Sequence, residues 1–158
     1  MKRFALLATA VFALSGTAIA ETQLTVTHGA VTKATYIDLG ETGDSVGDQR
    51  IFQFDARTGK DDKPVVTDWV MTTTGQGAIV KGMESRMTMA IFSFDGLAKD
   101  TILLQGIGLY PMVGSTLKSD TVLQRAIIGG TGKYASATGT VTSTHFQDNT
   151  WQHVFDLD

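Results

Sequence analysis

Residues 125–139 read RAIIGGTGKYASATG, and this glycine-rich stretch admits two interpretations that lead to different folds. The glycines form either the phosphate-binding loop of a nucleotide enzyme or a bend between two β-strands. A P-loop needs a glycine, four further residues and then Gly-Lys-Ser/Thr, so that the hydroxyl group reaches the magnesium ion. Counted from Gly132 and Lys133, the first glycine position holds Ile127 and the hydroxyl position holds Tyr134. The stretch therefore does not match a P-loop.

The spacing of a dinucleotide-binding turn, Gly-x-Gly-x-x-Gly/Ala, is present at Gly130, Gly132 and Ala135. Such a turn has to open a helix within a strand–helix–strand unit, whose backbone N–H groups then face the pyrophosphate. Here it is followed by residues 136–144, a run rich in Thr, Ser and Val that favours a β-strand. We therefore favour the bend, in which the glycines permit positive φ angles or a close approach of two backbones.

The first twenty residues predict a secretory signal peptide. Lys2 and Arg3 form a basic start, residues 4–14 are apolar and uncharged, and residues 18–20 read Ala-Ile-Ala, a pattern that signal peptidases cleave. The apolar run is too short for a membrane anchor, which needs about 20 residues. We expect cleavage after residue 20, which leaves residues 21–158 as one domain in the periplasm or outside the cell.

The charge balance and the lack of cysteine restrict the partners and the means of stabilisation. The chain of 158 residues has 13 Lys and Arg, 16 Asp and Glu, and a formal net charge of −3. This mildly acidic balance argues against nucleic acid and anionic lipid surfaces as partners. Because cysteine is absent, an exported form is held by its core and not by disulfides. No other long apolar run is present, so we expect no membrane association after cleavage.

Alternating polar and apolar residues predict β-strands along most of the chain. Phe52 and Phe54 share one face of such a run, and Ile51, Gln53 and Asp55 share the other. We expect strands at residues 50–55, 65–74, 86–94, 101–110, 122–128, 139–147 and 150–157, with breaker-rich turns between them. The nearest approach to a helix is one short turn within residues 115–124. About seven or eight short strands with tight links predict a single all-β domain, either a barrel or a sandwich.

The glycine-rich pattern also resembles a known family. The pattern Ile-x-Gly-Gly-Thr-Gly-Lys-Tyr-x-x-Ala-x-Gly at residues 127–139 is similar to the signature of plant dirigent proteins and of their structural relatives, the allene oxide cyclases. Weaker similarity at residues 46–55, 87–89 and 102–106 extends the resemblance to roughly residues 44–145. It implies an eight-stranded antiparallel β-barrel of lipocalin-like shape, often trimeric, with a mostly apolar cavity.

The resemblance further implies work on a small hydrophobic molecule without a bound cofactor. Dirigent proteins steer the coupling of phenoxy radicals that another enzyme makes, and allene oxide cyclases close an unsaturated fatty-acid epoxide into a cyclopentenone. Both act largely by holding a flexible substrate in one conformation. Where dirigent proteins commonly carry arginine this chain has Thr138, and no clear counterpart of the cyclases' catalytic residues is present. Fold therefore transfers more securely than chemistry.

Three charged residues are candidates for chemistry inside such a barrel. Asp55 matches the early-strand aspartate of the family, and a carboxyl group that faces an apolar cavity has a raised pKa and can act as a general acid or base. The alternative is a solvated aspartate at a strand end beside Arg57. Asp68 and Arg86 either face the same cavity as ligand-binding residues or form an ordinary ion pair across neighbouring strands.

Tyr110, His145 and His153 are further candidates for ligand binding. Tyr110 precedes Pro111 and is expected at the barrel mouth, where its hydroxyl group holds a ligand oxygen or its ring closes the rim. His145 and His153 lie on the two strands of one expected hairpin, which brings them close together. Two histidines without a third ligand make a poor metal site, so we predict no metal. The resemblance also implies that no cofactor is bound.

The strand at residues 86–94 has apolar side chains on both faces, with Met87 and Met89 on one and Phe92 and Phe94 on the other. One face lines the barrel, and the other is a candidate interface of a homo-oligomer, either a trimer or a dimer.

Three functions follow from these expectations. The chain is a cofactor-free isomerase, cyclase or stereochemical guide that uses Asp55, a non-catalytic carrier of an apolar ligand, or a structural barrel filled by its own side chains. We favour an exported cavity protein for a hydrophobic small molecule, and an interior cavity would exclude the filled barrel.

Overall fold

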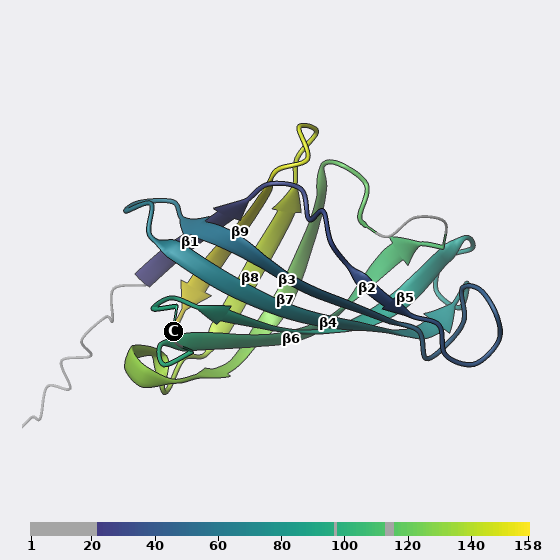
Figure 1. Cartoon of the computed structure of the whole chain (residues 1–158), viewed down its shortest axis with the longest axis horizontal. Coiled ribbons are helices and arrows are strands. Elements are labelled where there is room, and N and C mark those ends of the chain that lie inside the picture. The colour runs from purple at the N-terminus through teal and green to yellow at the C-terminus, as the bar shows by residue number, and fades with distance from the viewer. Residues whose placement is uncertain (1–21, 97, 113–115) are drawn as a thin grey trace, which may run out of the picture.

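The computed structural model describes residues 22–96, 98–112 and 116–158, which form almost entirely β-structure (Figure 1). The expected signal peptide lies outside the described residues. The strands are β1 (Thr22–His28), β2 (Thr35–Ile37), β3 (Gln49–Thr58), β4 (Pro64–Gln76), β5 (Met83–Ser93), β6 (Thr101–Pro111), β7 (Thr121–Gly130), β8 (Gly139–His145) and β9 (Trp151–Leu157), with a short 3₁₀-helix η1 (Gly132–Tyr134). Within these residues, no helix has the length and apolar character needed to cross a membrane.

The strands form one antiparallel sheet in the order β1-β9-β8-β7-β6-β5-β4-β3-β2. Pairing of β1 with β3 closes the sheet, with Val26 opposite Thr58 and Thr27 opposite Arg57. The closed part is an eight-stranded barrel, and β2 adds to it by pairing with β3. The fold is therefore the expected barrel and not a sandwich, and closure removes the exposed edges of the eight strands.

Alternation along each strand divides the barrel into an inner and an outer face. On β3, Phe52, Phe54 and Ala56 point inward, while Gln53 and Asp55 are exposed. The inner faces bury a core of Val26, Ala56, Val65, Trp69, Ala90, Phe92, Ile102, Leu104, Ile127, Val141 and Phe155. Each large apolar side chain removed from water in this way stabilises the fold by about 1.5–3 kcal/mol.

The glycine-rich stretch is the expected bend between strands. An added Cβ on Gly130 would lie 2.5 Å from the carbonyl oxygen of Thr101 and would also overlap Tyr134. Gly132 begins η1 with φ +58°, a conformation that other residues adopt at a cost. The bend places the ring of Tyr134 against Phe94, at 5.0 Å between centroids, which packs this end of the barrel.

Residues 116–124 contain no helical turn, so that expectation was wrong for the described part of the segment. Residues 116–120 form a loop, and Thr121 already begins β7. Two strands, β1 and β2, were not expected from the sequence.

Apolar side chains also gather on the outer face. Val70 on β4 lies opposite Met89 on β5, and Met87 lies opposite Ile107 on β6. All four are exposed, while Phe92 on the inner face of β5 is fully buried. The expected division of β5 into two apolar faces is therefore confirmed.

Candidate functional site

A cavity of about 160 Å³ lies inside the barrel. At one end, which we call the mouth, the lining includes Ala30 and Val31 after β1, Thr116 before β7 and Asn149 after β8. The glycine-rich bend follows β7 and therefore lies at the other end of the barrel. The interior is thus not filled completely by its own side chains.

Rings dominate the cavity lining. It contains the aromatic residues Phe52, Phe54, Trp69, Tyr110 and Trp151 and all three histidines of the chain, His28, His145 and His153. The ring of Trp151 stacks on His145 at 4.4 Å between centroids, and Trp69 packs edge-on against Phe92 at 5.7 Å. Flat apolar walls with few polar groups are typical of small-molecule sites.

Polar side chains form a chain of contacts around the inside of the barrel, with at least one residue from each of the eight strands. We call this set the polar belt: Arg50, Thr73, Glu84, Arg86, Tyr110, Arg125, Ser143, His153 and His28. All but His28 are fully or almost fully buried. The belt has a histidine part and a charged part, which differ in how their charges are balanced.

Hydrogen bonds in the histidine part assign the positions of the protons. His28 Nδ1 lies 2.6 Å from the carbonyl oxygen of Gly29 and must donate to it, which leaves Nε2 as an acceptor. His153 Nε2, at 3.1 Å, therefore donates to His28 Nε2. His153 Nδ1 then accepts from the hydroxyl of Ser143 at 2.8 Å. Every bond is satisfied with both imidazoles neutral.

The surroundings favour this neutral state. The pKa of His28 is lowered to about 4, because burial, the largest effect, and nearby His145 lower it by more than the hydrogen bond to Gly29 raises it. Burial also lowers the pKa of His153 well below its usual value, with further contributions from His28 and Arg125. Neither group carries a positive charge near neutral pH.

His145 is held separately, above the belt towards the mouth. Its Nδ1 lies 2.9 Å from the carbonyl oxygen of Leu117 and donates to it, which in the neutral tautomer makes Nε2 the acceptor. Among the described residues, no three His, Cys, Asp or Glu side chains are grouped so that they could hold a metal ion.

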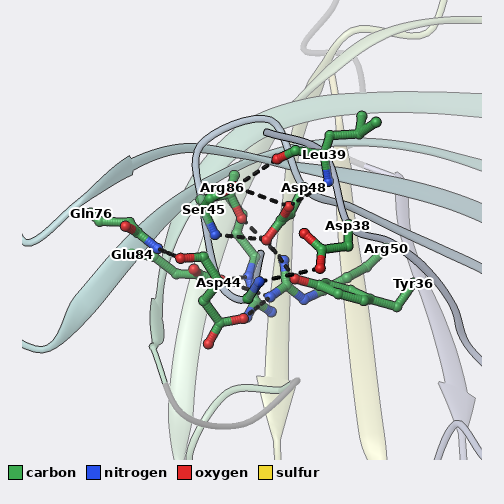
Figure 2. Close-up of polar contacts among 12 residues, drawn as sticks. Tyr36, Asp38, Leu39, Asp44, Ser45, Asp48, Arg50, Gln76, Glu84 and Arg86 are labelled. Carbon is green, nitrogen blue, oxygen red and sulfur yellow. Dashed lines mark hydrogen bonds and ion pairs between the residues drawn. The ribbon is translucent and has the colours of Figure 1, made fainter. Parts of the chain in front are cut away.

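The charged part of the belt continues next to β2 (Figure 2). Arg50 Nη2 lies 3.2 Å from Glu84 Oε1, and Arg86 Nε donates to the same oxygen. The guanidinium of Arg86 lies over the ring of Tyr110, at 4.4 Å from its centroid. Two buried arginines thus share one buried carboxylate.

Asp48 anchors the segment that covers this part of the belt (Figure 2). It accepts hydrogen bonds from Tyr36 Oη at 2.5 Å and from the backbone N–H groups of Leu39 and Ser45 at 2.9 and 2.8 Å. Burial, the largest single effect, raises the pKa of Asp48, but the hydrogen bonds together lower it to about 2. The carboxylate is therefore a structural anchor for the chain between β2 and β3.

Arg125 connects the two parts of the belt. It donates to Tyr110 Oη at 2.9 Å and to Ser143 Oγ at 3.4 Å, and its guanidinium lies 5.5 Å from the centroid of Trp69. These contacts are all with neutral groups, and Arg125 takes part in none of the ion pairs between described residues.

The structure brings three of the six expected site residues into the cavity lining. Tyr110, His145 and His153 all line it, and Tyr110 is almost fully buried near the end of β6. His145 and His153 were expected to lie close together, and both line the cavity, where the ring of Trp151 stacks near each of them.

The three expected charged residues lie elsewhere. Arg86 is buried in the polar belt but is not part of the cavity lining. Asp68 is on the outer face, where it accepts a hydrogen bond from Gln53 at 2.7 Å, so it forms no ion pair with Arg86. Asp55 is exposed on the outer face of β3, near Arg57 and away from the cavity lining.

Sequence reasoning missed His28 and Arg125. His28 belongs to β1, which was not expected as a strand. Arg125 lies on the buried face of β7 together with Ile127, and a charged residue on an apolar face is a signal that the sequence already contained.

Comparisons with known proteins address the fold. A pyocyanin demethylase superposes with a TM-score of 0.62 and 19% identity, covering 87% of this chain and 100% of that protein. A pterocarpan synthase dirigent protein superposes with a TM-score of 0.54 and 20% identity, covering 86% of this chain and 82% of the other. This chain has a dirigent-type barrel fold. The dirigent-type barrel is supported by structure alone, since no protein-family model and no curated protein sequence matches.

Proposed function

We propose that this dirigent-type barrel binds a small hydrophobic molecule with an aromatic ring inside its cavity. The observation that carries the proposal is the lining itself, which surrounds a space of about 160 Å³ with aromatic rings and opens at one end. A cavity of about 150 Å³ with apolar walls holds one benzene ring, so the space suits one ring with small substituents. The expected signal peptide supports a role after export.

Tryptophan fluorescence tests the proposal directly. The chain has two tryptophans, Trp69 and Trp151, and both line the cavity. A ring compound in the cavity should therefore change the emission of the protein, and the change should saturate. The molecule to test first is whichever small compound stays with the purified protein in native mass spectrometry.

Two matched variants locate the binding site. Met71→Phe adds bulk within the cavity lining, whereas Val70→Phe adds the same ring at the next residue, on the exposed outer face. The first variant should weaken binding and the second should leave it unchanged. Equal affinity in both variants would place any binding outside the cavity and contradict the proposal.

The second candidate is a cofactor-free isomerase or cyclase. The supporting observation is the lone pair of His145 Nε2, which belongs to a cavity-lining residue that is fixed by its hydrogen bond to Leu117. An imidazole in this state can accept a proton from a bound molecule. His145→Gln should then retain binding and lose the conversion of the co-purified compound to an isomer of equal mass. Conversion at the wild-type rate in that variant would exclude His145 as the base.

A further inference from the structure

Arg125 is a buried cation whose charge is not balanced within the described part of the protein. The residue is 4% exposed, and its hydrogen-bond partners are the neutral hydroxyl groups of Tyr110 and Ser143. The neighbouring arginines of the polar belt differ, because Arg50 and Arg86 both contact the buried carboxylate of Glu84. Burial of a charge without an opposite charge is costly, so a counter-ion close to Arg125 would be strongly favoured.

Two buried donors in the cavity lining lack an acceptor. Trp69 Nε1 and Arg125 Nε have no hydrogen-bond partner among the described residues, although both atoms are shielded from solvent. Native structures leave few buried donors unpaired, and an unpaired group at a site often marks the place of a missing partner. The two residues are also in contact, through the guanidinium over the indole ring. An acceptor group that reaches these two residues would supply the missing partner.

The cavity lining itself contains no such acceptor with a negative charge. None of its residues is Asp or Glu, and Arg125 is its one arginine or lysine. The nearest histidine of the belt, His153, already accepts at Nδ1 and donates at Nε2. A bound molecule with a negatively charged acceptor would therefore supply a partner that the cavity lining lacks.

We propose that the ligand is an aromatic anion, a ring compound whose carboxylate is held by Arg125 and Trp69. This inference rests on the proposed function and adds the charge of the ligand to it. A carboxylate offers two oxygen atoms, which match the two unpaired N–H groups. The aromatic walls then hold the ring, and Arg125 determines the preference for an acid over a neutral molecule of the same shape.

Benzoate and benzamide form a matched pair of probes, because they share ring and shape and differ in charge. Both are titrated into the ¹⁵N-labelled protein at pH 7, and the indole N–H signal of Trp69 and the Nε–H signal of Arg125 are followed by NMR. Trp69→Phe removes one indole signal and so distinguishes it from that of Trp151. We expect benzoate to bind at least about tenfold more tightly than benzamide, which corresponds to about 1.4 kcal/mol, and to shift both N–H signals downfield.

Variants of Arg125 assign this preference to one residue. Arg125→Gln should bind the two probes about equally, while Arg125→Lys should retain part of the preference because it keeps the charge. Trp69→Phe should weaken benzoate binding several-fold and benzamide binding less, since it removes a donor that a carboxylate accepts more strongly than an amide but keeps a ring. If Arg125→Gln does not fold, the comparison of the two probes on the wild-type protein still shows whether the cavity prefers an anion.

The outcomes separate the inference from the function on which it rests. Equal affinities for benzoate and benzamide in the wild-type protein, with saturable shifts of the cavity signals, would overturn the inference that the ligand is an anion. The proposal that the cavity binds a ring compound would stand. A preference for benzoate that survives in Arg125→Gln would overturn the role of Arg125. If neither probe shifts a cavity signal at millimolar concentration, ring binding and the inference both fail.

Discussion

Acid should destabilise the barrel through protonation of His28. The folded state lowers the pKa of His28 from 6.5 to about 4, chiefly by burial, so the unfolded chain binds the proton more readily. His28 therefore contributes stability that is fully present above about pH 6.5 and is lost as the pH falls towards 4. Between pH 7.5 and 4.5, these two pKa values correspond to about 2.5 kcal/mol. Because His28 is only partly buried, we expect a loss of about 2 kcal/mol.

Guanidinium chloride unfolding at pH 7.5 and 4.5 measures this loss. His28→Gln cannot titrate, but its side-chain oxygen can still accept the hydrogen bond from His153, so its stability should fall by about 2 kcal/mol less than that of the wild type. Trp151→Phe is the matched control, because it disturbs packing beside His28 without removing a titrating group. It should show the same fall as the wild type. The reasoning would be refuted by an equal fall in His28→Gln and in the wild type.

Three further changes test other parts of the molecule. Gly130→Ala should destabilise the barrel by about 3 kcal/mol in denaturant unfolding, because its Cβ would overlap the carbonyl of Thr101; a loss below about 0.5 kcal/mol would contradict the close approach. Asp48→Asn should cost about 2 kcal/mol at pH 7, since the hydrogen bond from Tyr36 loses its charged acceptor. The pKa of Asp48 in the folded protein is about 2, so the difference in unfolding free energy between Asp48→Asn and the wild type should become smaller as the pH falls from about 4 towards 2. Met89→Asp, on the apolar outer face, should turn a homo-oligomer into a monomer in light scattering after size exclusion; a monomeric wild type would refute that interface.

The strands could be predicted because most of them alternate clearly between apolar and polar residues. Phe52 and Phe54 on β3 and His153 and Phe155 on β9 mark the inner face in this way. The strand β1 lacks this clarity, because its sequence TQLTVTH has only two large apolar residues and its first residues closely follow the apolar stretch near the N-terminus. The short β2 is stabilised by tertiary contacts, above all by the hydrogen bond of Tyr36 to Asp48.

The candidate site was harder to predict than the fold. Asp55 was chosen by resemblance, yet the alternation of β3 alone places it on the opposite face from Phe52 and Phe54, where the structure has it. His145 and His153 were found because the alternation of their hairpin is clear. The link from Arg125 to Tyr110 joins β7 and β6 and depends on the register of both strands, which no local pattern specifies.

The polar belt explains why one barrel can contain arginines with different roles. Arg50 pairs with Glu84 and Asp44, and Arg86 pairs with Glu84, so both arginines have carboxylates of the chain itself as partners, and these ion pairs hold the strands next to β2 together. From Tyr110 onward the partners are hydroxyl groups and neutral imidazoles, and this is the part that borders the cavity. The low pKa values of His28 and His153 keep that part from gaining a second positive charge near neutral pH, which leaves Arg125 as the fixed charge of the cavity lining. A molecule that enters the cavity therefore contacts aromatic side chains and one cation without a counter-ion. If an acidic residue stood beside Arg125, it would neutralise this charge, and the cavity would no longer prefer an anionic ligand.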